Sequence, residues 1–542
     1  MMELRPWLKQ YPTRCDLDYP GLSLFHYLKH TADQYPGKTA LIYNNERITY
    51  REMMSRIDHL AAFFAAMGLK KGDRVALLLP NTPAYVYSFY GALRQGLMVV
   101  PIDPLLTSRE MGFIVRDTRA KILIVVDALF SLVEEAMLEQ EVENIVIFSL
   151  FGEADTPGAR YFEEIMQQSW PEPPDVIIDP EEDYALLLYT SGTTGFPKGC
   201  MLTHGNIIAN AWATRKILGE WKERFAGEDI LSIALLPFFG AYSIICSLIA
   251  GLTIPSGQIL VPLIDIDLVL ELIHQYRPAI VPGVPGLYTE LMQHPKTGQH
   301  SLDSIRICIS GDSPMAVEAL EQFEEKTGSS ILEGYGLTEA SPITHCNPFL
   351  GLRKPGSVGI PYPGTDCKIV DLETGERRLP PGEKGELVVK GPQVMKGYWN
   401  LPNKTAQALR DGWLYTGDIA WMDEDGYFYI VDRKVNIINY AGNKIFPREI
   451  EGVILEHPDV AEAVCIGVPE KYFGEVVKTF VVLRDGAEAT AEDVKDFCRA
   501  RLEKFKVPRH VEFRSELPRS VAGKVLRHKL IIEEQRRRLL AD

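Results

Sequence analysis

The sequence predicts an α/β protein of more than one domain, on the evidence of its length, its apolar content and the alternation of its apolar runs. The chain has 542 residues, of which 46% are hydrophobic, enough to bury more than one core. Between residues 41 and 148, apolar runs at 75–79, 122–126 and 145–148 alternate with longer stretches of helical character. This alternation is typical of parallel strands connected by helices.

Charge and cysteine content exclude several classes of function. A net charge of −16 argues against nucleic acid or acidic lipid as a partner, although local basic pockets for anionic ligands remain compatible with it. The eight cysteines include no CxxC pair, which indicates reduced thiols rather than a disulfide frame or a zinc site. Residues 1–15 lack the apolar core of a signal peptide, so we expect the cytoplasm as the location. The RRR run at 536–538 is expected at a solvated helix end.

The longest apolar run, residues 238–254, falls just short of a membrane span and lies between Pro237 and Pro255. Glycines and serines interrupt it, so we expect a buried segment rather than a transmembrane helix. Its mixture of aromatic and small residues fits equally the interior of a core and the wall of a pocket for an apolar substrate.

Two capping boxes mark predicted helix starts, one formed by Thr107 and Glu110 and the other by Thr490 and Asp493. Beyond residue 433 the predicted elements become shorter, with a helix near 449–456 and strands near 463–466 and 478–482. The C-terminal part is therefore expected to be a small α+β domain.

The stretch at 184–199, YALLLYTSGTTGFPKG, is the strongest functional signal in the chain. Residues 184–190 are almost all apolar or β-favouring, as in a strand buried on both faces, and residues 190–199 carry three glycines, four hydroxyls and one lysine. Such a loop exposes backbone donors, and with its hydroxyls and one cation it can surround a polyphosphate. The candidate ligands are Thr190, Ser191, Gly192, Thr193, Thr194, Gly195, Lys198 and Gly199.

Two other interpretations of this stretch were weighed. A serine- and threonine-rich surface turn is the usual fate of such a composition. A Walker loop is excluded, because GxxxxGK[ST] does not occur: Gly37-Lys38-Thr39 has Ala32 where the first glycine is needed.

The order of residues in this loop resembles the signature of the adenylate-forming enzymes, the superfamily of acyl-CoA synthetases, luciferases and peptide-synthetase adenylation domains. Further stretches carry the likeness in the same order from about residue 23 to 530. They are ISGDSP at 309–314, LEGYGLTEASP at 332–342, the YTGD, DGYFYIVDRK and GNKIFPREIE strings within 412–451, and LPRSVAGKVLRHKL near the end. The strings GYGLTEASPITHCNP and GPQVMKGYWNLP look most like long-chain fatty acid–CoA ligases.

The resemblance implies a set of site residues for ATP and Mg²⁺. The turn of Gly311, Asp312 and Ser313 would lie against the adenine, on which Tyr335 would stack. Thr338 would contact phosphate, and Glu339, with Thr194, would bind Mg²⁺, which prefers hard oxygen ligands. The same likeness adds Glu333, Gly334, Gly336 and Ile430 to the nucleotide site.

The remaining implied roles belong to the C-terminal part of the chain. Asp418 would accept both ribose hydroxyls, supported by Arg433; alone, the two would be read as a turn residue and a surface ion pair. Lys524 would bridge the substrate carboxylate and the α-phosphate during adenylation, acting with Thr194, Lys198 and Glu339. Gly442 would line the passage for coenzyme A.

The fold implied by the resemblance is a large N-terminal domain, residues 1–432, of mixed parallel sheets with helices and a small barrel-like part. A mobile α+β lid, residues 433–542, would carry Lys524 and rotate between two catalytic poses. Val435 departs from the residues common at that hinge. A monomer and a homodimer are both compatible with the sequence, as is peripheral membrane contact without a transmembrane segment.

The implied activity is that of an ATP-dependent acid–thiol ligase. It would activate a medium- to long-chain fatty acid as an acyl-adenylate, transfer it to coenzyme A, and release AMP and pyrophosphate. The pocket for the acid would be lined by Phe238, Phe239, Gly240, Ala241, Gly283, Tyr335 and Gly336, where Gly240 replaces a histidine common in relatives. The alternatives are a ligase for aromatic, branched or cyclic acids, an enzyme that loads a carrier protein, and a catalytically silent adenylate-binding regulator.

Overall fold

The computed structural model describes residues 5–11, 17–137, 142, 144–150, 160–190, 197–223, 230–470, 472–519 and 525–541. The backbone separates into two units, Met1–Asp366 with Val389–Leu414 and Cys367–Val388 with Tyr415–Asp542. This division groups residues 415–432 with the C-terminal part. The pivot expected at residue 433 is the point about which residues 433–542 would rotate. A division into compact units does not test such a rotation, so the pivot stays a prediction.

An eight-stranded sheet of the first unit contains the predicted parallel strands. Its strand order is β19-β9-β8-β4-β3-β5-β6-β7. β3, β5 and β6 pair in parallel, as the alternation of apolar runs predicts, and β4, which was not predicted, pairs in parallel with β3. The predicted box of Thr107 and Glu110 caps the helix that leads into β5. The elements are β3 (Arg74–Leu78), α3 (Pro83–Arg94), β4 (Met98–Pro101), α4 (Ser108–Thr118), β5 (Ile122–Val126), α5 (Phe130–Met137), β6 (Asn144–Phe148), β7 (Arg160–Tyr161), α6 (Phe162–Gln167), β8 (Tyr184–Thr190), β9 (Lys198–Thr203), α7 (His204–Glu223) and β19 (Gly397–Tyr398).

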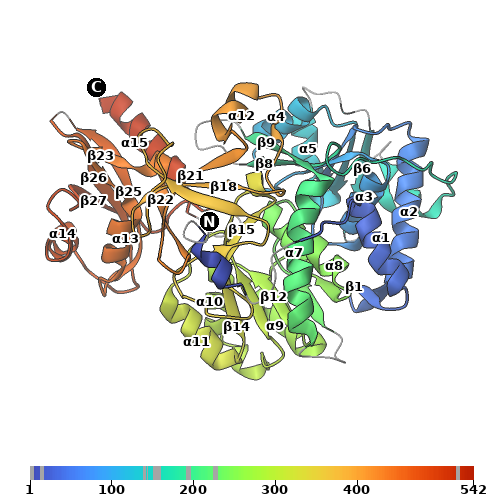
Figure 1. Cartoon of the computed structure of the whole chain (residues 1–542), viewed down its shortest axis with the longest axis horizontal. Coiled ribbons are helices and arrows are strands. Elements are labelled where there is room, and N and C mark those ends of the chain that lie inside the picture. Colours follow the sequence, from blue (N-terminus) through green and yellow to red (C-terminus); the bar gives the residue numbers. More distant parts are fainter. Residues whose placement is uncertain are drawn as a thin grey trace. The chain divides into compact units, whose positions relative to one another are not determined.

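A nine-stranded sheet forms the other half of this unit, in the order β16-β15-β14-β13-β12-β10-β11-β1-β2. Figure 1 shows α10 and α11 beside the β12 and β14 strands of this sheet. The elements are α1 (Leu24–Gln34), β1 (Thr39–Tyr43), β2 (Glu46–Thr49), α2 (Tyr50–Ala66), β10 (Leu231–Ala234), β11 (Gly257–Leu260), α9 (Ile266–Tyr276), β12 (Ile280–Gly283), α10 (Pro285–Gln293), β13 (Ile307–Ser310), α11 (Val317–Thr327), β14 (Ser330–Gly336), β15 (Ile343–Cys346) and β16 (Ile360–Pro361).

Strand β1, near the start of the 41–148 stretch, lies in the nine-stranded sheet. It pairs in parallel with β11 and antiparallel with β2. Asn44 and Asn45 form the two-residue turn between β1 and β2, both with positive φ (47° and 65°), which is the geometry that suits a tight hairpin.

The longest apolar run is buried, as predicted. Its centre forms a π-helix (Tyr242–Ile249) that continues into α8 (Ala250–Thr253), and all but the first residue of the π-helix are buried. Within the described residues, no helix has both the length and the apolar character needed to cross a membrane.

The second unit contains the predicted small α+β fold. A sheet in the order β24-β23-β26-β25, with β27 paired to β26, is preceded in the chain by a five-stranded sheet made of β17, β18, β20, β21 and β22. Of the elements in this part of the chain, α12 and β20 fall within 389–414, which belongs to the first unit. The predicted box of Thr490 and Asp493 caps α14. The elements are β17 (Asp366–Val370), β18 (Gly385–Lys390), α12 (Pro402–Ala408), β20 (Leu409–Arg410), β21 (Trp413–Met422), β22 (Phe428–Arg433), β23 (Ile438–Tyr440), β24 (Asn443–Ile445), α13 (Pro447–Leu455), β25 (Val460–Glu470), β26 (Gly474–Leu483), α14 (Ala491–Arg499), β27 (His510–Phe513) and α15 (Arg527–Ala541).

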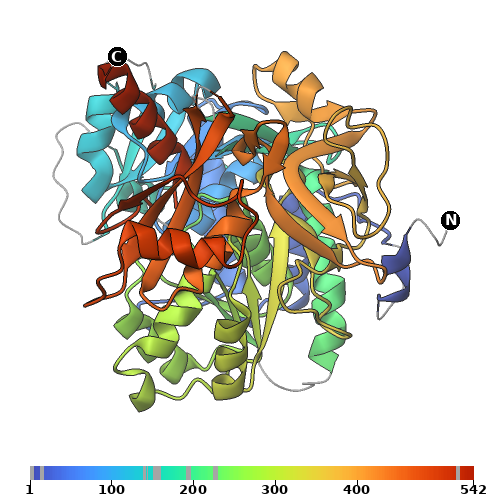
Figure 2. The same cartoon turned by 90° about the vertical axis from the view of Figure 1, so that its left-hand side faces the viewer.

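The β25–β26 pair separates two apolar cores. Alternate residues on one face, such as Cys465 and Val477, pack with Ile450 of α13 and Val494 of α14. The alternating residues of the same two strands, such as Val464 and Val476, face the other way. They pack with Leu530 of α15, the dark red helix that ends at the C label in Figure 2. This period of two is expected for a strand pair covered on both faces.

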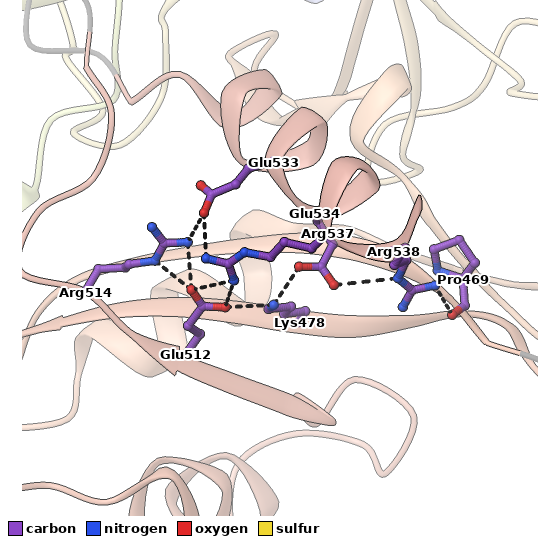
Figure 3. Close-up of polar contacts among 8 residues, drawn as sticks. All are labelled: Pro469, Lys478, Glu512, Arg514, Glu533, Glu534, Arg537 and Arg538. Atoms are coloured by element: carbon purple, nitrogen blue, oxygen red, sulfur yellow. Dashed lines mark hydrogen bonds and ion pairs between the residues drawn. The ribbon is translucent and has the colours of Figure 1, made fainter. Parts of the chain in front are cut away.

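The arginine run at 536–538 lies near the end of α15, as predicted, but two of its members are not simply solvated. Arg537 pairs with Glu512 and Glu533, and Arg538 donates to the carbonyl oxygen of Pro469 at 2.7 Å (Figure 3). Long basic side chains near a helix end can reach carboxylates on a neighbouring strand, which one-dimensional composition does not reveal.

His204, the first residue of α7, gives a test of the first unit's packing. Its ring is fully buried, its Nδ1 accepts a hydrogen bond from the Leu24 backbone N–H at 3.2 Å, and burial lowers its pKa to about 3. In the unfolded chain the ring takes up a proton near its ordinary pKa of about 6.5. The contribution of the neutral ring to the free energy of unfolding is therefore present in full above that pKa. It is lost as pH falls toward the pKa of the ring in the folded state.

We predict that the loss amounts to about 1.4 kcal/mol per pH unit below about pH 6 for this residue. The measurement is the fall in Tm between about pH 7.5 and about pH 5.5, compared with that of His204→Asn, which retains an acceptor without a titrating ring. The variant should be less stable at the higher pH and show the smaller fall. Equal falls would contradict the prediction.

Candidate active site

The ends of the predicted polyphosphate loop are held together by strand pairing. β8 and β9 are antiparallel, with Thr190 opposite Lys198, and Thr190 Oγ1 donates to the carbonyl oxygen of Lys198 at 3.5 Å. Strand β8 is buried through its middle, as its composition predicts, whereas β9 was not predicted. Ser191, Gly192, Thr193, Thr194 and Gly195, all assigned to ATP from the sequence, lie outside the described residues.

Beside this hairpin, three side chains from distant parts of the sequence meet. Strand β19 pairs with β9 and places Tyr398 opposite Cys200. Tyr398 Oη donates to Glu339 Oε1 at 2.7 Å, and Lys198 Nζ lies 4.3 Å from the centroid of the tyrosine ring. Burial, together with the Glu339 carboxylate, raises the pKa of Tyr398, so the phenol is a neutral donor at any physiological pH.

Sequence reasoning missed Tyr398. Its signal was present in the GYW of GPQVMKGYWNLP, a string used only for its family likeness. The contact with Glu339 joins residues 59 positions apart, and it exists because β19 is the edge strand next to β9.

The surroundings of Glu339 fit a magnesium ion that is held mainly by a bound nucleotide. Glu339 lies in a short 3₁₀ turn (Thr338–Ala340) and is half-exposed, and within the described part of the chain Tyr398 is the donor to its carboxylate. No group of three or more His, Cys, Asp or Glu residues placed to hold a metal occurs among the described residues. One carboxylate completed by phosphate oxygens and waters is an ordinary Mg²⁺ shell.

The residues assigned to adenine lie at the ends of neighbouring parallel strands. β13 leads into Gly311, which is buried, and then into Asp312 and Ser313, which are exposed. Asp312 has a φ of +68°, a conformation that aspartate tolerates better than most side chains. On β14, Tyr335 is half-buried, and a Cβ at Gly336 would fall 2.0 Å from the Pro342 carbonyl oxygen, so that position requires glycine.

Glu333, just before these residues, has a different environment from Glu339. It is 9% exposed, and its Oε2 accepts a hydrogen bond from the Gly356 backbone N–H at 3.0 Å. Burial raises its pKa to about 7. The Glu333 carboxyl group can therefore gain or lose a proton near neutral pH. Gly334 is the next residue in the strand.

The candidate acid pocket is built around the start of the π-helix. Phe238, Ala241 and Gly283 are buried, whereas Phe239 and Gly240 are half-buried. Among the described residues other than its two chain neighbours, a Cβ at Gly240 would meet the Ser243 hydroxyl at 3.7 Å, an ordinary van der Waals contact. The position therefore has room for a small side chain.

The two aromatic side chains considered as fillers of that space are fixed elsewhere. Tyr242 Oη donates to the Ile309 carbonyl oxygen at 2.7 Å and is 3.3 Å from that of Gly283. Tyr288 is fully buried, and its Oη donates to the carbonyl oxygens of Val281 and Ile309, each at 2.8 Å. Both rings are tied to the carboxyl ends of β12 and β13.

In the second unit, Asp418 and Arg433 face each other across β21 and β22. They are register partners, and Arg433 Nε lies 3.3 Å from Asp418 Oδ1. Asp418 is 6% exposed and lies within a strand, which rules out a role as a turn residue. Ile430 is half-buried on β22, opposite Ala420, and Gly442 is exposed with a φ of +87°. Lys524 lies outside the described residues.

Together these features define a class of protein: a two-unit α/β protein in which a strand hairpin adjoins a half-exposed glutamate and a buried carboxylate is paired with an arginine. Comparison with known proteins gives the same class. The AMP-binding enzyme family matches residues 28–399, and the AMP-binding enzyme C-terminal domain matches residues 449–524. The chain belongs to the AMP-binding enzyme family.

Individual relatives cover nearly the whole chain. A long-chain-fatty-acid–CoA ligase of Bacillus subtilis (strain 168) is 41% identical, over 98% of this chain and 99% of the relative. ATP-bound MatB from Rhodopseudomonas palustris superposes with a TM-score of 0.83 at 30% identity, covering 95% of this chain and 99% of that one. The anthranilate CoA ligase AuaEII, in complex with anthranoyl-AMP, has a TM-score of 0.85 at 28% identity, with 96% and 99% covered.

The Tyr398–Glu339 hydrogen bond can be tested directly. Tyr398→Phe keeps the ring under Lys198 and removes the donor, so the carboxylate loses a bond worth about 1.5–3 kcal/mol. We predict a fall in ATP-dependent activity of about 10- to 100-fold, with a raised requirement for Mg²⁺. The measurement is initial rate against Mg²⁺ concentration.

The matched control is Tyr189→Phe, which removes a similar tyrosine–carboxylate bond, to Asp117 at 2.6 Å. The control should leave the Mg²⁺ dependence unchanged. If the two variants show the same dependence on Mg²⁺, Tyr398 does not act through Glu339.

Proposed function

We propose that this protein is an ATP-dependent fatty acid–CoA ligase. It activates a medium- to long-chain carboxylic acid as an acyl-adenylate, transfers the acyl group to coenzyme A, and releases AMP and pyrophosphate. The observation that carries the proposal is the likeness to a long-chain-fatty-acid–CoA ligase over 98% of the chain. The cluster of Lys198, Glu339 and Tyr398 beside the anion loop supports it from the structure.

In the first half-reaction the acid's carboxylate attacks the α-phosphorus of ATP. The new bond, between the carboxylate oxygen and the α-phosphorus, is a mixed anhydride, and the bond from the α-phosphorus to the oxygen that bridges to the β-phosphate breaks to release pyrophosphate. Lys198 and Lys524 stabilise the charge that develops on the phosphate oxygens, as fixed cations do in a site that excludes water. Glu339, with Thr194, would hold Mg²⁺, which would supply further positive charge to the phosphates.

In the second half-reaction the thiol of coenzyme A attacks the acyl carbon, and AMP leaves. No side chain acts as a nucleophile, which agrees with the absence of a GxSxG elbow from the sequence. We place the pivot between the two steps at residue 433, with 433–542 moving as a lid and Gly442 beside the path of the thiol. Asp418 binds the ribose of the nucleotide, with Arg433 beside it. We propose the cytoplasm as the location.

The test is incubation of the purified protein with ATP, Mg²⁺ and a panel of acids, with and without coenzyme A, followed by mass spectrometry. The panel contains straight fatty acids of several lengths and branched, cyclic and aromatic acids. AMP and thioester formed from fatty acids support the proposal. Thioester formed only from aromatic acids would favour the aromatic ligase, and adenylate that accumulates unchanged by coenzyme A would favour a carrier-protein acceptor.

Lys524→Ala tests the division of labour between the two steps. We predict that adenylation falls about 100- to 1000-fold, because one fixed charge in such a site contributes about 3–4 kcal/mol. Thioester formation from a supplied acyl-adenylate should largely survive. The measurements are pyrophosphate release without coenzyme A and thioester formation without ATP. Equal loss of both steps would refute the assignment.

Gly240 bears on which acids the pocket accepts. The room for a Cβ at this position and the fixed rings of Tyr242 and Tyr288 favour a pocket with space near the acyl carbon. Bulk close to the carboxyl group, as in branched or cyclic acids, would then be tolerated along with straight chains.

Gly240→His puts this interpretation to the test. In an open pocket the added ring should reject branched and cyclic acids while straight fatty acids keep most of their kcat/KM. In a filled pocket, overpacking of about 1–3 kcal/mol should injure every substrate. The measurement is kcat/KM across the acid panel, with Gly240→Ala as the small-volume control. Uniform loss across the panel would overturn the open-pocket interpretation.

A further inference from the structure

A buried ion cluster joins the start of the last helix to the end of β22, and it involves none of the residues assigned so far. Arg527, the first residue of α15, donates through Nη2 to Glu451 Oε1 at 2.5 Å, and its Nη1 lies 3.5 Å from Asp432 Oδ1. The side chain of Arg527 is 16% exposed, that of Glu451 12% and that of Asp432 0%. One guanidinium therefore serves two buried carboxylates.

Asp432 fixes the segment that follows it. Its Oδ1 accepts hydrogen bonds from the Arg433 backbone N–H at 2.7 Å and from Asn436 Nδ2 at 2.8 Å. Its Oδ2 accepts from the backbone N–H of Arg448, at the start of α13, at 3.0 Å. The carboxylate that pairs with Arg527 thus also sets the backbone at Arg433, whose side chain pairs with Asp418.

On the other side, Arg527 adjoins the stem of the loop that carries Lys524. The Leu526 backbone N–H donates to the Pro518 carbonyl oxygen at 2.7 Å, and Arg519 and Val525 form an antiparallel bridge. The described residues on either side of 520–524 are therefore paired with each other. In the sequence, Lys524 comes directly before the Val525–Leu526 side of this stem, and Arg527 comes directly after it.

We propose that Arg527 is a positioning residue for adenylation. It holds the paired stem next to Lys524 in the sequence close to the carboxylate of Asp432, which also orders Arg433, so its loss would disturb both ends of this connection. Reaction rates in such sites are sensitive to displacements of about 1 Å. The inference rests on the roles proposed above for Lys524 and Arg433.

The rest of α15 is held to the sheet by contacts that do not involve Arg527. A positioning role of Arg527 can therefore be distinguished from a role in holding the helix in place. Lys478 on β26 pairs with Glu512 on β27 at 2.8 Å and with Glu534 on α15 at 2.7 Å, and Arg537 pairs with Glu533 and Glu512 (Figure 3). Leu530 is buried against the sheet. These contacts should keep the helix in place when Arg527 is changed.

The experiment compares Arg527→Met, Arg527→Lys and the control Arg537→Met in the two half-reactions. Arg537→Met removes an arginine of the same helix, away from the cluster with Asp432. For Arg527→Met we expect pyrophosphate release from ATP and fatty acid to fall about 10- to 100-fold, with thioester formation from supplied acyl-adenylate nearly unchanged. Arg527→Lys should recover part of the loss, since an ammonium can serve one of the two carboxylates. The control should match the parent in both steps.

Lys524→Ala, measured in parallel, separates the failure of this inference from that of the proposed function. If Lys524→Ala spares adenylation, the proposed role of the lysine fails. If Lys524→Ala loses adenylation while Arg527→Met matches the control, or loses both steps equally, the positioning role is overturned. Should Arg527→Met not fold because two carboxylates are left buried without a cation, the double variant Arg527→Met with Glu451→Gln removes one of those charges and is judged by the same outcomes.

Discussion

The antiparallel pairing of β8 with β9 is the constraint on which the first unit's site depends. β8 is bonded on both edges, because Leu186 pairs with Val99 of β4 on one side and with Leu202 of β9 on the other. With no free edge, the strand cannot shift its register without breaking two ladders, and the loop that leaves it at Thr190 must return at Lys198. β9 in turn receives β19, which brings Tyr398 to Glu339. One hairpin therefore places a cation, a phenol and a carboxylate that lie far apart in sequence.

Two glutamates six positions apart differ in environment because one lies within a strand and the other lies beyond its end. Glu333 is still within the sheet, where burial raises its pKa to about 7. Glu339 has left the sheet for a half-exposed turn, where a phenol donates to it. The distance along the chain from the sheet thus separates a buried carboxyl group from one that solvent can reach.

The sequence carried local information well and distant pairing poorly. The buried strand at 184–190, the parallel strands β3, β5 and β6, and both capping boxes were predictable because each depends on neighbouring residues. Strand β9 was missed because its alternation is short and includes a lysine and a glycine. The Tyr398–Glu339 and Arg527–Asp432 contacts depend on which strand lies beside which, and no periodicity within one segment reports that.

The cysteines have a practical consequence. The seven that the structure describes are all buried. Burial raises the pKa of the thiols of Cys200, Cys246, Cys308, Cys346, Cys465 and Cys498, in the last case to about 11. Maleimides react with the exposed thiolate, so these positions should label slowly in the folded protein. Fluorophores attached to cysteines introduced on the surfaces of the two units could then report their separation during turnover, without first removing the native thiols of the described residues.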